Sequence, residues 1–208
     1  MANRLGVHPV SPQSRLIERA ADVVRRGGLL LCPTDAGYAF VWGVDARQAE
    51  ERVIRLRALD TRHPFTLLCR SVSEVGQLTR LDDQAFRLIR ALAPGPVTFI
   101  LPASPGLPRR LRQAKRRAVG VRVPDHPAAI ALMDTVGEPL LTTSLVLPGD
   151  EDEAMPSHEV EPVAERMLRH VDLMIDAGDC PQGPTTVIDC TGDPPEVTRE
   201  GFVPVHLD

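Results

Sequence analysis

The chain has 208 residues and a formal net charge of −4 at pH 7, and hydrophobic residues make up 43% of it. That hydrophobic content supports a sizeable core and excludes global disorder, while the negative charge argues against a generally basic nucleic-acid binder. No apolar run is long enough to cross a bilayer, and the N-terminus lacks the apolar core of a signal peptide, so we expect a cytoplasmic protein without membrane contact.

The predicted elements alternate between helix and strand along the chain. Ser11-Pro12 predicts the start of a helix that ends at Gly27-Gly28, and residues 29–32 read as a strand buried on both sides. Asp82 predicts the cap of a later helix, with Phe86, Ile89 and Leu92 toward the core. The other expected elements are helices over 46–57, 126–136 and 158–169, a polar loop over 148–157, and strands over 65–69, 97–101, 119–123, 140–143, 171–176, 186–190 and 196–199.

This alternation predicts a single-domain α/β fold over residues 1–208. The strands at 186–190 and 196–199 follow each other too closely for a helical crossover, so we expect a mixed sheet and not a purely parallel one.

The segment "GGLLLCPTDAGYAF", residues 27–40, begins as a buried strand and then changes character. Pro33 cannot donate to a sheet ladder and predicts the strand's end, while Gly37 permits a tight turn. Thr34, Asp35 and Tyr38 then crowd this turn with hydrogen-bonding groups. The pattern fits a ligand site at a strand end and an ordinary polar turn about equally.

Four cysteines are scattered without the spacing of a metal site. We expect buried free thiols and no structural metal. The residues concerned are Cys32, Cys69, Cys180 and Cys190.

Arginines and hydroxyl side chains gather in the loops after the predicted strands, with few carboxylates and no obvious nucleophile. If these loops converge, the resulting site suits an anionic group held by charge-assisted hydrogen bonds. It does not suit hydrolysis by paired carboxylic acids.

Four motifs, "GGLLLCPTDAGY", "PGPVT", "VGVRVPDHP" and "PTTVID…REG", resemble in order and spacing the signatures of the YrdC/TsaC family. The variants "FTLLC", "PRRL" and "TTSLVLPG" are most similar to its YciO branch. The resemblance places the motif-bearing core at about 12–203. It implies a twisted, open, mixed sheet flanked by helices, with a concave positive cavity.

The activity that this resemblance implies is synthesis of L-threonylcarbamoyladenylate from ATP, L-threonine and bicarbonate, for modification of tRNA. Mg²⁺ would arrive with ATP and be held mainly by its phosphates. The family's roles fall on two groups of residues, those for threonine being Thr34, Tyr38, Arg122, Thr142 and Thr185, and those for ATP being Arg55, Arg57, Ser144 and Arg199. No catalytic residue is assigned beyond substrate positioning, and Asp35 is as well explained by turn capping as by base chemistry.

Two departures from the family's synthases affect the expected ATP site. Their K-x-R pair is read here as Arg55-Leu56-Arg57, and residues two apart diverge on a helix, so both can hold phosphates only if the helix ends near Leu56. Their Ser-Ala-Asn is read as Ser144-Leu145-Val146, which replaces an amide by an apolar side chain. Synthase activity is therefore expected to be weak, absent or directed to another substrate, a related carbamoyl acceptor being one alternative.

The second function considered is an RNA-binding module that recognises double-stranded RNA, tRNA or a ribosomal element. A basic segment within residues 109–122 favours it, although a solvated charged face is the commoner fate of such a run. The candidate RNA-binding residues are Arg109, Arg110, Arg112, Lys115, Arg116 and Arg117.

The opening motif yields one geometric expectation. Thr34 and Tyr38 should turn into a cavity beside Arg122, at the rim where the strand ends. The competing arrangement packs Tyr38 in the core and leaves Thr34 to cap the turn.

Overall fold

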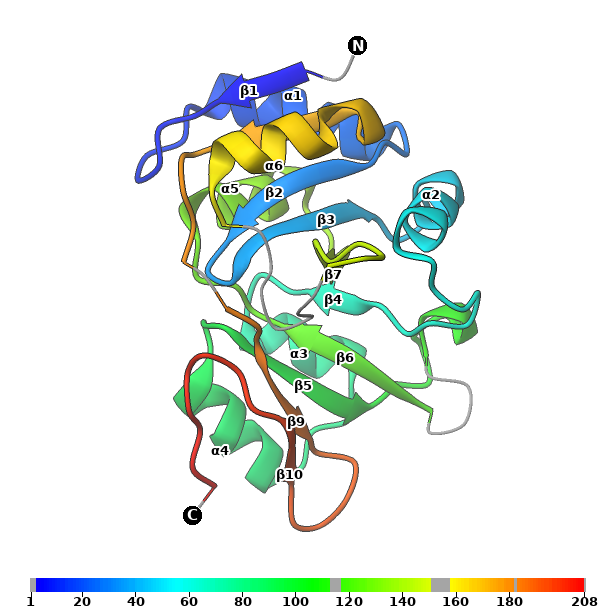
Figure 1. The fold of residues 1–208 in the computed structure, drawn as a ribbon. Coiled ribbons are helices and arrows are strands. Elements are labelled where there is room, and N and C mark those ends of the chain that lie inside the picture. Colours follow the sequence, from blue (N-terminus) through cyan, green and yellow to red (C-terminus); the bar gives the residue numbers. More distant parts are fainter. Residues whose placement is uncertain (1–2, 113–116, 151–157, 182, 208) are drawn as a thin grey trace.

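The structure, a computed structural model, describes residues 3–112, 117–150, 158–181 and 183–207. In this part of the chain ten strands form one mixed sheet in the order β1-β8-β2-β3-β7-β4-β6-β5-β9-β10 (Figure 1). The strands are β1 (Asn3–Gly6), β2 (Leu30–Thr34), β3 (Gly37–Gly43), β4 (Thr66–Leu68), β5 (Val97–Pro102), β6 (Ala118–Arg122), β7 (Leu140–Ser144), β8 (Leu173–Asp176), β9 (Thr186–Asp189) and β10 (Glu196–Arg199). The predicted α/β class and mixed sheet are confirmed, because β2 pairs parallel to β8 and antiparallel to β3.

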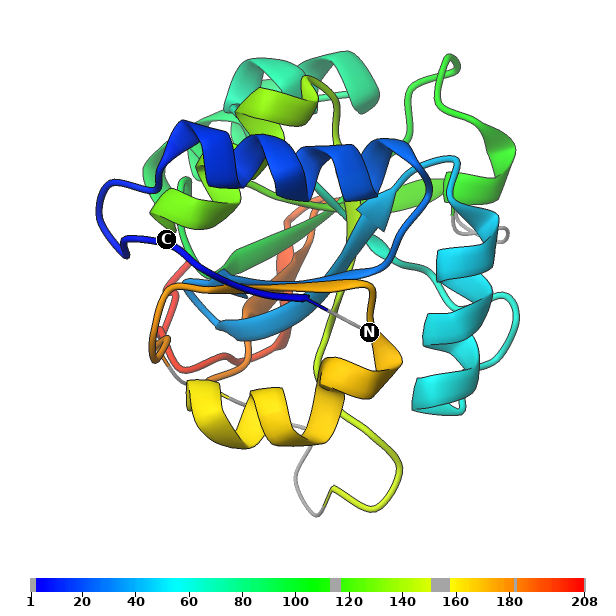
Figure 2. The same cartoon turned by 90° about the horizontal axis from the view of Figure 1, so that it is seen from above.

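Helices cover both faces of the sheet. They are α1 (Ser14–Arg25), α2 (Arg47–Arg57), α3 (Val72–Leu78), α4 (Asp83–Leu92), α5 (Pro127–Val136) and α6 (Val160–Met167), with short 3₁₀ turns at Arg109–Leu111 and Leu168–His170. Seen from above, α1 and α5 lie on one side of the sheet and α6 on the other (Figure 2). Leu30 and Cys32 pack with α1 and α5, whereas Leu29 and Leu31 join the cluster that contains Met167 of α6. Burial from both sides explains the uninterrupted apolar run at the start of β2.

The opening hairpin differs from the prediction, because Pro33 does not end the strand. Pro33 pairs with Tyr38, and Thr34 with Gly37, so the chain turns within the sheet and returns as β3. Only Leu30 and Leu31 of β2 pair with β8, so the missing N–H of Pro33 leaves no gap on that side. Gly37 has φ +88°, the left-handed conformation that the tight turn requires.

Helix starts were predicted with mixed success. Asp82 caps α4 as expected, its carboxylate accepting a hydrogen bond from the Ala85 N–H at 2.7 Å. The expectation that Phe86 faces the core is wrong, since it is 43% exposed. Helix α1 begins at Ser14 and has no side-chain cap, so Ser11-Pro12 precedes the helix and does not open it.

Three elements, β1, β3 and α3, were not predicted at all. The first strand is short, and α3 has only seven residues, below the length at which hydrophobic periodicity becomes visible. The four cysteines are buried and free, as expected. None of the helices in the described ranges has the length and apolar character needed to span a membrane.

Candidate functional site

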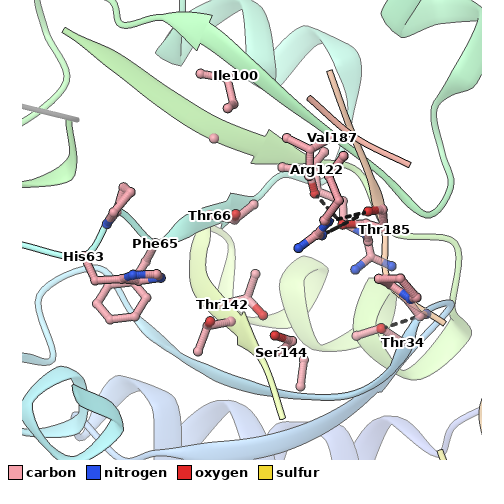
Figure 3. Close-up of a pocket in the computed structure, with 18 of the residues that line it drawn as sticks. Thr34, His63, Phe65, Thr66, Ile100, Arg122, Thr142, Ser144, Thr185 and Val187 are labelled. Carbon is pink, nitrogen blue, oxygen red and sulfur yellow. Dashed lines mark hydrogen bonds between the residues drawn. The ribbon is translucent and has the colours of Figure 1, made fainter. Parts of the chain in front are cut away.

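A cavity of about 370 Å³ opens across the middle of the sheet, where residues from eight of its strands meet the segment that follows α2 (Figure 3). Its described wall contains three arginines and no carboxylate. Seven hydroxyl side chains complete the polar lining, namely Thr34, Thr66, Thr98, Thr142, Thr143, Ser144 and Thr185. The expected convergence of arginines and hydroxyls after the strands is therefore confirmed. Such a wall suits an anionic ligand.

Thr34 and Arg122 share this cavity, as the opening motif predicts. The Thr34 hydroxyl donates to the Gly37 carbonyl at 2.7 Å and accepts from the Ala36 N–H at 3.1 Å, so it also holds the turn. A hydroxyl has one proton and two lone pairs, and only one lone pair stays available to a ligand.

Asp35, which directly follows β2, forms a buried ion pair with Arg122, the last residue of β6. Their side chains are 9% and 7% exposed, and one guanidinium nitrogen of Arg122 donates to Asp35 Oδ1. Asp35 Oδ2 and Arg122 Nε have no hydrogen-bond partner among the described residues. Desolvation lowers the pKa of the Arg122 guanidinium, and the charge of Asp35 opposes that effect. Asp35 thus compensates the charge of Arg122, a role that turn capping did not anticipate.

Tyr38 lies elsewhere, and the expectation that its phenol faces the cavity is wrong. The side chain is fully buried, and its hydroxyl donates to the Gly178 carbonyl at 2.8 Å. Burial also raises the pKa of this phenol well above its usual value. The residue follows Gly37 in a strand with every position buried, so the competing arrangement, a core tyrosine, holds.

Arg55 and Arg57 also separate, because α2 continues to Arg57 and residues two apart on a helix diverge. Arg57 lines the cavity, whereas Arg55 is exposed beside Arg52 and Arg169 in a surface hollow outside it. Leu59, two residues after Arg57, also lines the cavity. Of the expected pair of phosphate-facing arginines, only Arg57 lines the cavity, and the placement of Arg55 in it was wrong.

Arg57 anchors the end of β7. Its Nε donates to the Val146 carbonyl at 2.9 Å, and its terminal nitrogen donates to the Thr143 hydroxyl. Ser144 is exposed at the cavity wall, and Thr142 donates to the Phe40 carbonyl at 2.9 Å. Val146 is 7% exposed and contributes its backbone, not its side chain, to this network.

Thr185 and Arg199 meet at the C-terminal side of the cavity. The Arg199 guanidinium donates to the Thr185 carbonyl at 2.9 and 3.1 Å and to its hydroxyl at 2.9 Å. The same hydroxyl lies 3.2 Å from that of Thr98, a cavity residue of the "PGPVT" motif to which no role was assigned. A Cβ at Gly201 would lie 2.3 Å from the Thr186 nitrogen, which explains the glycine of "REG".

The basic segment is partly neutralised by its own surroundings. Arg110 pairs with Asp45, and Arg112 donates to the carbonyl oxygens of Pro105 and Leu107. Arg109 and Arg117 are exposed, while Lys115 and Arg116 lie outside the described residues. RNA binding through this segment stays a prediction. Metal-type clusters of three or more His, Cys, Asp or Glu side chains are absent from the ranges that the structure covers.

Comparison with known proteins found relatives over nearly the whole chain. The Sua5/YciO/YrdC family model, described as telomere recombination, matches residues 22–201. The chain is 46% identical over 195 residues to YciO of Escherichia coli K12, covering 94% of this chain and 93% of that protein. The crystal structure of E. coli YciO has a TM-score of 0.90 at 45% identity, covering 97% of each chain.

Threonylcarbamoyl-AMP synthases are more distant relatives. The putative threonylcarbamoyl-AMP synthase of Methanocaldococcus jannaschii is 27% identical, with 93% of this chain and 89% of that protein covered. The crystal structure of Pyrococcus abyssi Sua5 complexed with L-threonine has a TM-score of 0.85 at 26% identity, covering 97% of this chain and 58% of that one. The match over most of the chain shows that this protein belongs to the Sua5/YciO/YrdC family.

Proposed function

We propose that the cavity binds L-threonine and ATP and that the protein is an ATP-dependent nucleotidyltransferase of the threonylcarbamoyladenylate synthase type, linked to threonylcarbamoyladenosine in tRNA. One observation carries the proposal. Residues from strands far apart in the sequence place three arginines and seven hydroxyls around one cavity whose described wall has no carboxylate. A family relative with the same fold over nearly all of this chain was crystallised with L-threonine.

The amino acid would bind at the end of the cavity formed by Thr34 and Arg122. Arg122 is held by Asp35, and its side chain lines the cavity at this end. A substrate carboxylate would bind the part of the guanidinium that faces the cavity through a charge-assisted hydrogen bond. Thr185 adds a hydroxyl to the cavity wall at this end, and Thr142 adds one in the middle of the cavity.

The reaction needs positioning more than covalent help. The threonine amine combines with bicarbonate to give a carbamate and water, and a carbamate oxygen then attacks the α-phosphate of ATP while pyrophosphate leaves. Arg57, Arg199 and Ser144 would hold the phosphates in line and offset their charge. Mg²⁺ would enter as part of the ATP substrate, because the described cavity wall offers it no carboxylate ligand.

The test is a pyrophosphate-release assay on the full chain, with ATP, L-threonine and bicarbonate omitted in turn. We expect release only when all three are present, and calorimetric titration should show binding of L-threonine and of ATP separately. Release that ignores threonine or bicarbonate would overturn the proposed reaction, and so would a protein that binds neither ligand.

A gain-of-function variant sharpens this test. Leu59 lines the cavity two positions after Arg57 and carries no charge, so a cation introduced there would face the phosphates that Arg57 is proposed to hold. Leu59→Arg should therefore lower the KM for ATP, while Leu59→Met, a change of similar size without charge, should leave it unchanged. An unchanged KM in Leu59→Arg would show that this part of the cavity does not face the phosphates.

A further inference from the structure

One end of the cavity is aromatic, in contrast to its polar remainder. His63 and Phe65 line this end, and Trp42 packs behind Phe65 with a ring-centroid distance of 4.9 Å and an interplanar angle of 86°. His63 and Phe65 are 5.3 Å apart between ring centroids. Edge contacts of this kind fix the orientation of a ring while leaving much of its surface open. Both rings are only partly buried, so they present surface to the cavity.

The aromatic end and the amino-acid end lie on opposite sides of a polar middle. Figure 3 shows His63 and Phe65 at one side, Arg122, Thr185 and Thr34 at the other, and Thr66, Thr142 and Ser144 between them. Arg57, whose charge acts on His63, stands next to the aromatic end. Along the length of the cavity, the aromatic side chains of His63 and Phe65 come first, then Arg57 with the hydroxyls of the middle, and then the buried pair of Asp35 and Arg122.

We propose that His63 and Phe65 form the platform on which the base of the nucleotide stacks, so that this end determines the preference for a nucleotide over other polyphosphates. Every nucleic base has a π face, and stacking on an aromatic side chain is a common way to hold one. This inference rests on the proposed function, because it places the base of the same ATP whose phosphates are assigned to Arg57 and the hydroxyls.

The surroundings of His63 favour its neutral form. Desolvation lowers the pKa of His63 and the positive charge of Arg57 lowers it further, while the charge of Asp60 opposes both effects. The role of His63 at this end is that of an aromatic surface, and Leu59, Pro64 and Phe65 give it an apolar surrounding.

Calorimetric titration with AMP and with inorganic tripolyphosphate separates base binding from phosphate binding. Phe65→Leu keeps an apolar side chain but removes the ring, and the matched control is Phe86→Leu, the same change at an exposed phenylalanine of α4 outside the cavity. We expect Phe65→Leu to weaken AMP by roughly 5- to 150-fold, the range for loss of one base–aromatic stack. Tripolyphosphate should bind both variants and the unmodified protein alike.

A second measurement avoids any loss of stability in Phe65→Leu. Trp42 is the only tryptophan in the chain and contacts Phe65 directly, so its emission reports on the platform in the unmodified protein. AMP should change that emission, and tripolyphosphate should not. Equal responses to the two ligands, or an AMP affinity unaltered by Phe65→Leu, would overturn the inference.

The outcomes separate this inference from the proposed function. AMP binding that depends on Phe65 without any pyrophosphate release would retain the platform and reject the synthase reaction. Pyrophosphate release with a KM for ATP unaffected by Phe65→Leu would retain the reaction and reject the platform. Failure to bind AMP and ATP at all would reject both.

Discussion

Replacing Asp35 by asparagine removes the charge that compensates Arg122 while preserving the size of the side chain. The two residues are 9% and 7% exposed, so the guanidinium would be left in a poorly solvated site without its counter-charge. Breaking a buried ion pair on one side costs about 3–5 kcal/mol. We expect a loss of about 3 kcal/mol, the lower end of that range, because asparagine keeps an oxygen that can accept from Arg122.

Urea unfolding followed by Trp42 emission measures this loss. With a slope of about 3 kcal/mol per molar urea, a loss of this size lowers the midpoint by about 1 M. The double variant Asp35→Asn, Arg122→Gln removes both charges, and its destabilisation should fall short of the sum of the single changes by about 2 kcal/mol. An Asp35→Asn midpoint within about 0.3 M of the unmodified protein, or a coupling below about 0.5 kcal/mol, would refute the account of this pair.

Three further changes test separate parts of the structure. Arg122→Lys should weaken L-threonine about tenfold or more while ATP affinity stays within about threefold in calorimetry, because an ammonium cannot replace a planar fork; equal losses for both ligands would indicate a folding defect instead. His126 is buried with its pKa lowered by desolvation, so the unfolded chain takes up a proton below pH 6.5 that the folded protein resists, and stability is lost as the pH falls. His126→Asn keeps an acceptor for the Ala128 N–H but cannot take up the proton. The urea midpoint of this variant should therefore fall less between about pH 7.5 and pH 5.5 than that of the unmodified protein, and an equal fall would show that His126 does not cause the pH dependence. Gly201→Ala brings a Cβ to 2.3 Å from the Thr186 nitrogen and should cost about 1–3 kcal/mol of unfolding free energy; a midpoint equal to that of the unmodified protein would show that the segment moves aside freely.

Most of the fold follows from hydrophobic periodicity, and the errors have local causes. The segment 37–43 was missed as a strand because Pro33 and Gly37 were read as the end of sheet pairing. Both residues are tolerated there, since the pairing of β2 with β8 ends at Leu31 and the turn requires a positive φ at Gly37. A strand buried at every position also lacks the alternation by which strands are recognised.

The sequence predicted that the site lies where several strands end, but it did not predict which side chains line the cavity. The expected helix over 46–57 implied that Arg55 and Arg57 diverge, but only the packing of α2 in the structure shows which of the two reaches the cavity. The Asp35–Arg122 pair joins residues 87 positions apart, which no local pattern can reveal. Phe65 was read as part of a strand, and only the tertiary packing against Trp42 shows it as a cavity residue.

The position of β8 between β1 and β2 bears on the order of events during synthesis. Leu30 and Leu31 find their parallel partners at Leu173 and Met174, so the inner edge of the first hairpin stays open until the ribosome has made most of the protein. β1 is in the same position, since its partner is also β8. Unpaired strand edges attract other chains. The growing polypeptide is therefore exposed to aggregation through its N-terminal region until β8 emerges, and nascent chains that end after β7 should be sensitive to protease there while the finished protein is resistant.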